Sequence, residues 1–164
     1  MEKLWAPWRM QLIESEKPSG CIFCKFFEEE DEHANLVLGK TASSYVVLNK
    51  YPYNNGHLMV IPSAHVASLE ELSEEAYAEL QRLLRTSIQV VKEVYGPDAL
   101  NVGMNLGRAA GAGIAEHLHW HIVPRWTGDV NFMPVLAETR VIPEHLEASW
   151  QKLRPAFERA LAGG

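Results

Sequence analysis

The sequence lacks concentrated positive charge and long apolar runs, and both absences narrow the possible partners. Its 164 residues carry a formal net charge of −6 and contain no run of lysine or arginine, which argues against a nucleic-acid backbone or an anionic membrane. No apolar run approaches the roughly 20 residues that span a bilayer. The first residues, 1–5, lack the charged-then-apolar pattern of a signal peptide. We therefore expect a cytoplasmic protein that binds neither nucleic acid nor membrane.

Cysteine is also scarce, since the chain has only Cys21 and Cys24, spaced Cys-x-x-Cys. In a reducing compartment this spacing indicates metal or redox chemistry before it indicates a structural disulfide. A closed tetrahedral zinc site would need two more ligands. His65 and one histidine of residues 117–121 are the available candidates. A redox pair and two unconnected cysteines are the alternative interpretations.

What is present predicts one α+β domain. Hydrophobic residues at 47% and charged residues at 22% are ordinary for a globular protein. Apolar residues recur at three- and four-residue intervals from Tyr77 to Tyr95, which predicts a long helix that Ser68 or Ser73 caps. A second helix is expected to begin at Pro143-Glu144. Short strands are predicted over residues 36–38, 45–49, 57–61 and 100–105 and through the segment from 116 onward, which together favour an antiparallel sheet.

The segment from Glu116 to Pro124 holds three of the chain's seven histidines, at alternate positions. On a strand they would share one face, roughly 6–7 Å apart, whereas on a helix they would fan around the axis by about 200°. A row of imidazoles makes a poor core, because each buried ring has two nitrogens that need partners.

Three interpretations of this row remain open. It is a packing coincidence, a three-histidine metal site, or a set of rings with different tasks. A metal site usually needs a ligand from another strand, because side chains in one row do not converge easily on one ion. In the third interpretation one ring is a nucleophile and its neighbours bind phosphate. Neutral imidazole suits this, since its pKa of about 6.5 leaves it able to attack phosphorus without a separate base.

A small-residue loop, Gly107 to Gly113, comes just before the histidines. Small residues allow backbone N–H groups to approach a phosphate closely. The loop is not a P-loop, because no Gly-Lys-Ser/Thr follows it. A tight turn between two strands is the alternative interpretation.

These residues resemble a known family. The stretch His117-Leu-His119-Trp-His121-Ile-Val is similar to the His-φ-His-φ-His-φ-φ motif of the histidine-triad family, where φ is apolar. Residues 105–107 and 49–62 resemble its other signatures, so the likeness covers roughly 20–126. Residues 4–9 and 124–126 resemble bacterial members near the diadenosine tetraphosphate phosphorylases and the Fhit-type diadenosine triphosphate hydrolases.

The resemblance implies a histidine-triad-like fold. That fold has a roughly five-stranded antiparallel sheet with one long helix and a C-terminal helix. We expect a single domain over 1–164, with an arm at 1–20, a core at 21–126 and a C-terminal extension at 127–164. It also implies a homodimer in which two sheets join.

The resemblance further implies a nucleotide hydrolase or transferase that cleaves at the α-phosphate of a dinucleoside polyphosphate, such as diadenosine tetra- or triphosphate. His119 would be the nucleophile, and phosphate or water would release the covalent nucleotidyl group from it. Many members carry Gln and Ser or Thr where this chain has Gly113-Ile114, a departure that slightly favours phosphate as acceptor. An adenosine phosphoramidase and a nucleotide sensor with little turnover are the alternatives.

The family's site residues correspond to positions of this chain. Its zinc ligands correspond to Cys21, Cys24, His65 and His117, and a divalent cation such as Mg²⁺ could accompany the nucleotide. The other implied contacts are His121 and His57 to phosphate oxygens, Asn49 to the ribose, Val47 and Met59 to the base, and Asn105 with the backbone of Gly111, Ala112 and Gly113 to the phosphates.

Overall fold

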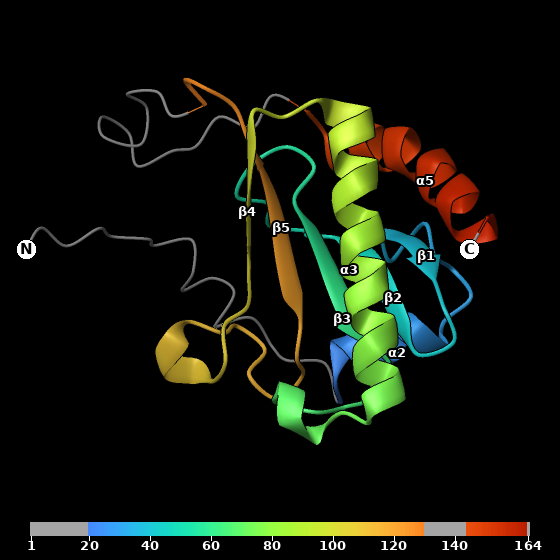
Figure 1. The fold of residues 1–164 in the computed structure, drawn as a ribbon, viewed down its shortest axis with the longest axis vertical. Coiled ribbons are helices and arrows are strands. Elements are labelled where there is room, and N and C mark those ends of the chain that lie inside the picture. Colours follow the sequence, from blue (N-terminus) through green and yellow to red (C-terminus); the bar gives the residue numbers. More distant parts are fainter. Residues whose placement is uncertain (1–19, 130–143, 164) are drawn as a thin grey trace, which may run out of the picture.

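A computed structural model describes residues 20–129 and 144–163, in which five strands form one antiparallel sheet (Figure 1). The sheet order is β1-β2-β3-β5-β4. The predicted α+β class is therefore confirmed, while most of the expected N-terminal arm and residues 130–143 lie outside the described residues. The strands are β1 Val37–Lys40, β2 Ser44–Leu48, β3 Leu58–Pro62, β4 Ala99–Gly103 and β5 Trp120–Arg125.

The longest helix, α3 (Glu74–Tyr95), begins and ends where the sequence predicts. The Ser73 hydroxyl accepts the Ala76 N–H at 3.2 Å, and Gly96 ends the helix with a left-handed φ of 53°. Ser68 instead precedes the short 3₁₀ turn η1, Leu69–Glu71. The other helical segments are α2 Ile22–Glu28, the 3₁₀ turn η2 Arg108–Ala110 and α5 Leu146–Ala162.

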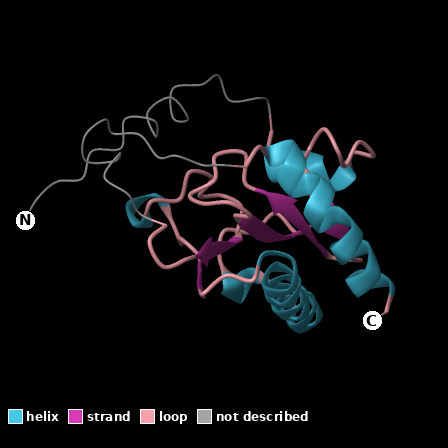
Figure 2. Cartoon of the chain, turned by 90° about the horizontal axis from the view of Figure 1, so that it is seen from above, coloured by secondary structure: helices cyan, strands magenta, loops and turns pink. Residues whose placement is uncertain are grey.

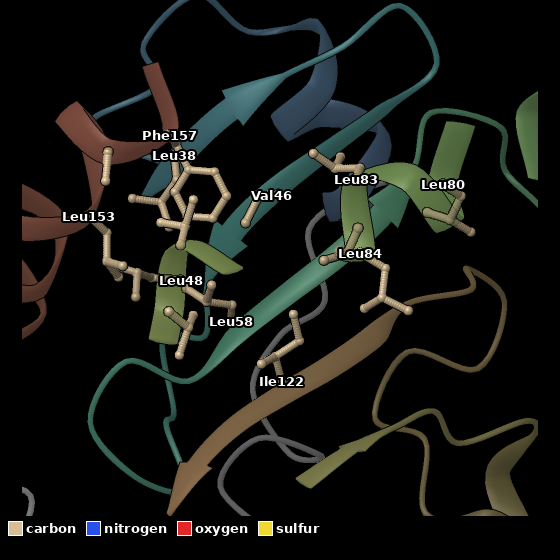
Figure 3. Close-up of a cluster of buried hydrophobic side chains, with 14 of the residues drawn as sticks. Leu38, Val46, Leu48, Leu58, Leu80, Leu83, Leu84, Ile122, Leu153 and Phe157 are labelled. Atoms are coloured by element: carbon tan, nitrogen blue, oxygen red, sulfur yellow. The ribbon is translucent and has the colours of Figure 1, made fainter. Parts of the chain in front are cut away.

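Helices α3 and α5 cover one face of the sheet. Figure 2 shows α3 nearly end-on beside that face, and Figure 3 shows the side chains between the layers. Alternate residues of each strand point into this core. Leu48, Leu58 and Ile122 come from three adjacent strands, and Leu153 and Phe157 come from α5.

The opposite face carries a smaller apolar cluster under α2. Its members alternate with those of the main core along the same strands, so they point the other way. Phe23 of α2 packs there. His121 pairs with Met59 and His119 contacts Phe23, so these two histidines share this face. The other members of this cluster are Val37, Tyr45, Val47, Met59 and Ile61.

The prediction that the histidine strand extends from residue 116 was wrong in its starting point, because β5 begins at Trp120. The β3–β5 register pairs Val60 with Trp120, so its continuation would set Pro62 opposite Leu118. Proline has no N–H to donate to such a ladder. Instead, the Leu118 N–H donates to the Val66 carbonyl at 2.7 Å. The alternation still holds, since Leu118, Trp120 and Ile122 all pack against the main core.

Candidate active site

The floor of the site is one row of residues that runs across the sheet. Val47 pairs with Met59, Met59 with His121, and His121 with Gly103. Directly paired residues point to the same face, so the two positions expected to contact a base adjoin a triad histidine. At Gly103 an added Cβ would meet no atom of the described residues within 4 Å. Within that part of the chain, the row therefore ends in open space beside His121.

Four potential metal ligands converge at one end of the histidine segment. The ligand atoms of Cys21, Cys24, His65 and His117 all lie within 4.8 Å of one another. His117 Nδ1 is 3.3 Å from Cys21 Sγ and 3.6 Å from Cys24 Sγ, and His65 Nδ1 is 3.3 Å from Cys24 Sγ. Tetrahedral zinc, with Zn–S near 2.3 Å and Zn–N near 2.0 Å, sets ligand atoms roughly 3.3–3.8 Å apart. The set therefore fits a closed zinc site, as its residue types predicted.

A backbone carbonyl orients the His117 ring for this site. Its Nε2–H donates to the Pro62 carbonyl at 2.8 Å, and a carbonyl can only accept. The Nδ1 that faces the cysteines is therefore the unprotonated nitrogen, which is the one that binds metal. His117 is buried, and burial lowers its pKa, so the neutral ring is favoured.

His119 is held in the same way, with its free nitrogen on the other side of the ring. Its Nδ1–H donates to the His117 carbonyl at 2.8 Å. Nε2 therefore keeps its lone pair. Burial of the ring lowers the pKa of His119, which keeps Nε2 unprotonated at neutral pH. This is the tautomer that an attacking imidazole needs.

A chain of hydrogen bonds places the proton of His121 on Nε2, the nitrogen that is unprotonated in His119. The Tyr53 backbone N–H donates to His57 Nδ1 at 3.0 Å, so the proton of neutral His57 is on Nε2. That Nε2–H donates to His121 Nδ1 at 2.9 Å. His121 therefore carries its proton on Nε2, from which it can donate to a phosphate oxygen.

Burial and neighbouring histidines keep this pair neutral. They lower the pKa of His57 to about 3 and that of His121 to about 4. His57 is fully buried, and both of its nitrogens are engaged by the chain. It thus offers no free nitrogen to a phosphate, unlike the direct contact that the resemblance implied.

Of the remaining positions expected to contact the nucleotide, Asn49 has side-chain contacts within the chain, and the others lie in a connecting loop. The Asn49 side-chain oxygen accepts the Tyr51 N–H at 2.9 Å, and its amide nitrogen is 3.4 Å from His57 Nε2. Asn105 and the backbone of Gly111 to Gly113 belong to the connection between β4 and β5, in which Gly107 and Gly111 have positive φ. Their contacts with ribose and phosphate stay predictions.

Sequence reasoning missed two aromatic residues at this site. Phe23 lies between the two cysteines, and its ring contacts both His117 and His119, with centroids 5.5 and 5.1 Å apart. Tyr53 places its ring 4.7 Å from that of His57, while its N–H sets that residue's tautomer. The position of Phe23 inside the Cys-x-x-Cys motif was a usable signal. Nothing in the sequence indicated which backbone N–H would face His57.

Comparison with known proteins gives consistent matches. The model of the HIT domain family matches residues 30–128. A Mycobacterium tuberculosis protein named AP-4-A phosphorylase is 39% identical over 97% of this chain and 86% of its own length. The Schizosaccharomyces pombe adenosine 5'-monophosphoramidase hnt1 is 31% identical over 81% of this chain and 95% of its own length.

Solved structures agree with these sequence matches. A zinc-bound histidine triad family protein from Mycobacterium smegmatis superposes with a TM-score of 0.69 and 25% identity, covering 88% of this chain and 98% of its own. A hypothetical histidine triad nucleotide-binding protein from Sulfolobus tokodaii superposes with a TM-score of 0.67 and 27% identity, covering 87% and 93%.

Proposed function

The chain belongs to the HIT domain family, and from that premise we propose that it cleaves dinucleoside polyphosphates at the α-phosphate through a covalent nucleotidyl-histidine on His119. One observation carries the proposal. The His117 carbonyl fixes the proton of His119 on Nδ1, which leaves Nε2 as a nucleophile beside His121. The ring centroids of the two histidines are 4.9 Å apart, so nucleophile and proton donor can address one phosphate group.

In the first step, the Nε2 lone pair of His119 attacks the α-phosphorus. A P–N bond forms, the P–O bond to the second nucleotide breaks, and that nucleotide leaves with the bonding electrons. The attacking ring becomes positively charged, and the His117 carbonyl that accepts its Nδ1–H stabilises this charge. The Nε2–H of His121 donates to an oxygen of the transferring phosphoryl group, where charge accumulates.

In the second step, an acceptor oxygen attacks the same phosphorus, any proton on that oxygen passes to solvent, and the P–N bond breaks, which returns the electron pair to Nε2 of His119. With diadenosine tetraphosphate, ATP leaves in the first step. Phosphate as acceptor then gives ADP, and water gives AMP. We propose phosphate, supported by Gly113-Ile114, which replace the Gln and Ser or Thr of many family members, and by the relative named as a phosphorylase.

Contacts of the nucleotide follow from the row on the sheet. We propose that the base packs on Val47 and Met59, since both share the face of His121. Asn49 binds the ribose, and Asn105 with the loop before the triad binds phosphates. His57 supports phosphate binding through His121. A loss of affinity for AMP in Asn49→Ala, measured by calorimetry, would test the ribose contact.

The metal we propose for Cys21, Cys24, His65 and His117 is zinc. Two thiolates and two imidazoles suit it better than Mg²⁺, which prefers oxygen ligands. Zinc there would give structural stability. Among the described residues, this is the single group of three or more potential metal ligands, so a Mg²⁺ ion would arrive with the nucleotide.

We also propose a cytoplasmic homodimer. The final strand in the sheet order, β4, is largely exposed, and Val102 on it is 40% exposed. Such an edge can pair with a second copy. Of the helices in the described residues, none is long and apolar enough to cross a bilayer. Light scattering on the wild type and on Val102→Glu tests the dimer, and cell fractionation tests the compartment.

Product analysis tests the reaction. Diadenosine tetraphosphate is incubated with enzyme, with and without inorganic phosphate, and nucleotides are separated chromatographically. ADP plus ATP that depends on phosphate supports phosphorolysis, whereas AMP plus ATP indicates hydrolysis. His119→Gly should abolish both reactions, and retained turnover would refute the covalent mechanism. Slow release of AMP from every substrate would favour a nucleotide sensor.

A second candidate is an adenosine phosphoramidase, which the likeness to the S. pombe phosphoramidase favours. It would use the same His119 intermediate with an amine as leaving group. Comparison of kcat/KM for adenosine 5'-phosphoramidate and for diadenosine tetraphosphate separates the two. A clear preference for the phosphoramidate would reverse our assignment of the substrate.

A further inference from the structure

Phe23 lies between the metal-ligand cluster and the proposed nucleophile. Its side chain is 3% exposed. The ring meets His117 edge-on, with an interplanar angle of 84°, and meets His119 at 60°. One phenyl ring therefore touches both a metal-ligand candidate and the attacking imidazole.

The sheet anchors the backbone that carries this ring. The Tyr45 hydroxyl donates to the Phe23 carbonyl at 2.8 Å. Lys40 Nζ donates to the carbonyls of Phe27 and Glu29 at 2.9 and 2.8 Å, at the end of α2. Because α2 is fixed at both of these points, Phe23 resists displacement when the His119 ring moves.

The orientation of the His119 ring depends on a fixed neighbour of this kind. The hydrogen bond from its Nδ1 to the His117 carbonyl fixes one atom of the ring but leaves the ring free to tilt about that bond. His121 contacts the ring at 72°, and Phe23 contacts it independently. The hydrogen bond and these two ring contacts together define the direction of the Nε2 lone pair. Reaction rates depend strongly on that direction.

We infer that Phe23 is a positioning residue for His119, and that its place between Cys21 and Cys24 couples the direction of the nucleophile to metal binding by this segment. The inference rests on the proposed role of His119 as nucleophile. A metal that holds both cysteines would fix the backbone on each side of Phe23. The ring would then press on His119 in one position instead of several.

The chain offers a matched control in Phe157. It is also a buried phenylalanine, at 0% exposed, and it lies in the main core beside Leu38 (Figure 3). Phe23→Leu and Phe157→Leu should each lower the melting temperature. Only Phe23→Leu should also lower kcat, on the order of 10- to 100-fold, with little change in KM. The zinc content should stay unchanged in both variants.

A second readout does not depend on turnover. In nitrogen-15 NMR spectra, the wild-type His119 should show a protonated Nδ1 and an unprotonated Nε2. Phe23→Leu should keep the proton on Nδ1 but broaden and shift the His119 signals, because the ring samples several tilts, and Phe157→Leu should give the wild-type spectrum. If the wild type turns over no substrate, the proposed function fails, but these spectra still decide the role of Phe23.

A separate experiment tests the coupling between metal binding and the orientation of His119. Chelation of the wild-type metal should shift the His119 signals toward those of Phe23→Leu, and chelation of that variant should add no further change. Additive changes would overturn the coupling. Wild-type kcat and spectra in Phe23→Leu, or equal losses in Phe157→Leu, would overturn the positioning role.

Discussion

Replacing His57 with leucine should reduce catalysis although the His57 side chain is fully buried. Leucine has a similar volume, so the packing around this buried position is largely kept. It cannot donate to His121 Nδ1, which now receives the His57 Nε2–H at 2.9 Å. Without that donor, His121 is free to protonate Nδ1 instead, and its Nε2 would then present a lone pair to phosphate.

The expected loss follows from the bond at stake. A hydrogen bond to a charged group contributes about 1.5–3 kcal/mol, and about 1.4 kcal/mol corresponds to tenfold in rate. His57→Leu should therefore lower kcat/KM for diadenosine tetraphosphate roughly 10- to 150-fold. The Tyr53 N–H also loses its acceptor, which should lower the free energy of unfolding by about 1–3 kcal/mol.

His57→Gln serves as the matched control. The glutamine amide can place an N–H near the former Nε2 and donate to His121, so it should recover much of kcat/KM. The tautomer of His121, read by nitrogen-15 NMR, should switch in His57→Leu and persist in His57→Gln. Equal kcat/KM for wild type and His57→Leu, with an unchanged His121 spectrum, would refute the relay.

Three further predictions concern metal, pH and backbone geometry. Purified protein should contain one zinc per chain by elemental analysis, and Cys24→Ser should lose it together with several degrees of melting temperature. The lowered pKa values of His57 and His121 mean that the unfolded chain binds more protons below pH about 6.5. The free energy of unfolding should therefore fall as the pH drops from 6.5 toward 4, by about 1.4 kcal/mol per pH unit for each histidine. Denaturant titrations at several pH values should show that this free energy depends less steeply on pH in His57→Gln than in the wild type. Gly56→Ala should destabilise the fold by more than about 1 kcal/mol in the same titrations, because φ is +68° and the new Cβ would lie 2.7 Å from the Tyr95 ring; an unchanged midpoint would contradict this.

Local sequence patterns predicted the helix and the strands whose apolar residues follow a clear spacing along the chain. The stripe from Tyr77 to Tyr95 gave the long helix, and Gly96 gave its end. Short apolar runs at residues 45–48 and 58–61, separated by a loop rich in Pro, Asn and Gly, predicted the central strands, which occupy nearly the predicted positions. These features depend on neighbours in the chain, and the chain shows them directly.

Features that depend on contacts between distant residues were harder to predict. The start of β5 depends on Pro62 lying across from Leu118, which is known only once the register is known. The seven-residue α2 was too short to show a periodic stripe. The role of His57 likewise depends on Tyr53 and His121 meeting it in space. Cys21, Cys24 and His65 were identified as ligand candidates by residue type, whereas the resemblance to the family selected His117 from the three neighbouring histidines.

Main-chain atoms set the protonation pattern of this site. The carbonyls of Pro62 and His117 and the N–H of Tyr53 decide which nitrogen of each imidazole carries hydrogen, directly or through one relay. The path of the backbone thus determines which nitrogen of each histidine donates a hydrogen bond and which one accepts. Val47 and Met59, the proposed base contacts, take no part in these hydrogen bonds, so substitutions there should change the preferred base and leave the tautomers of the histidines unchanged.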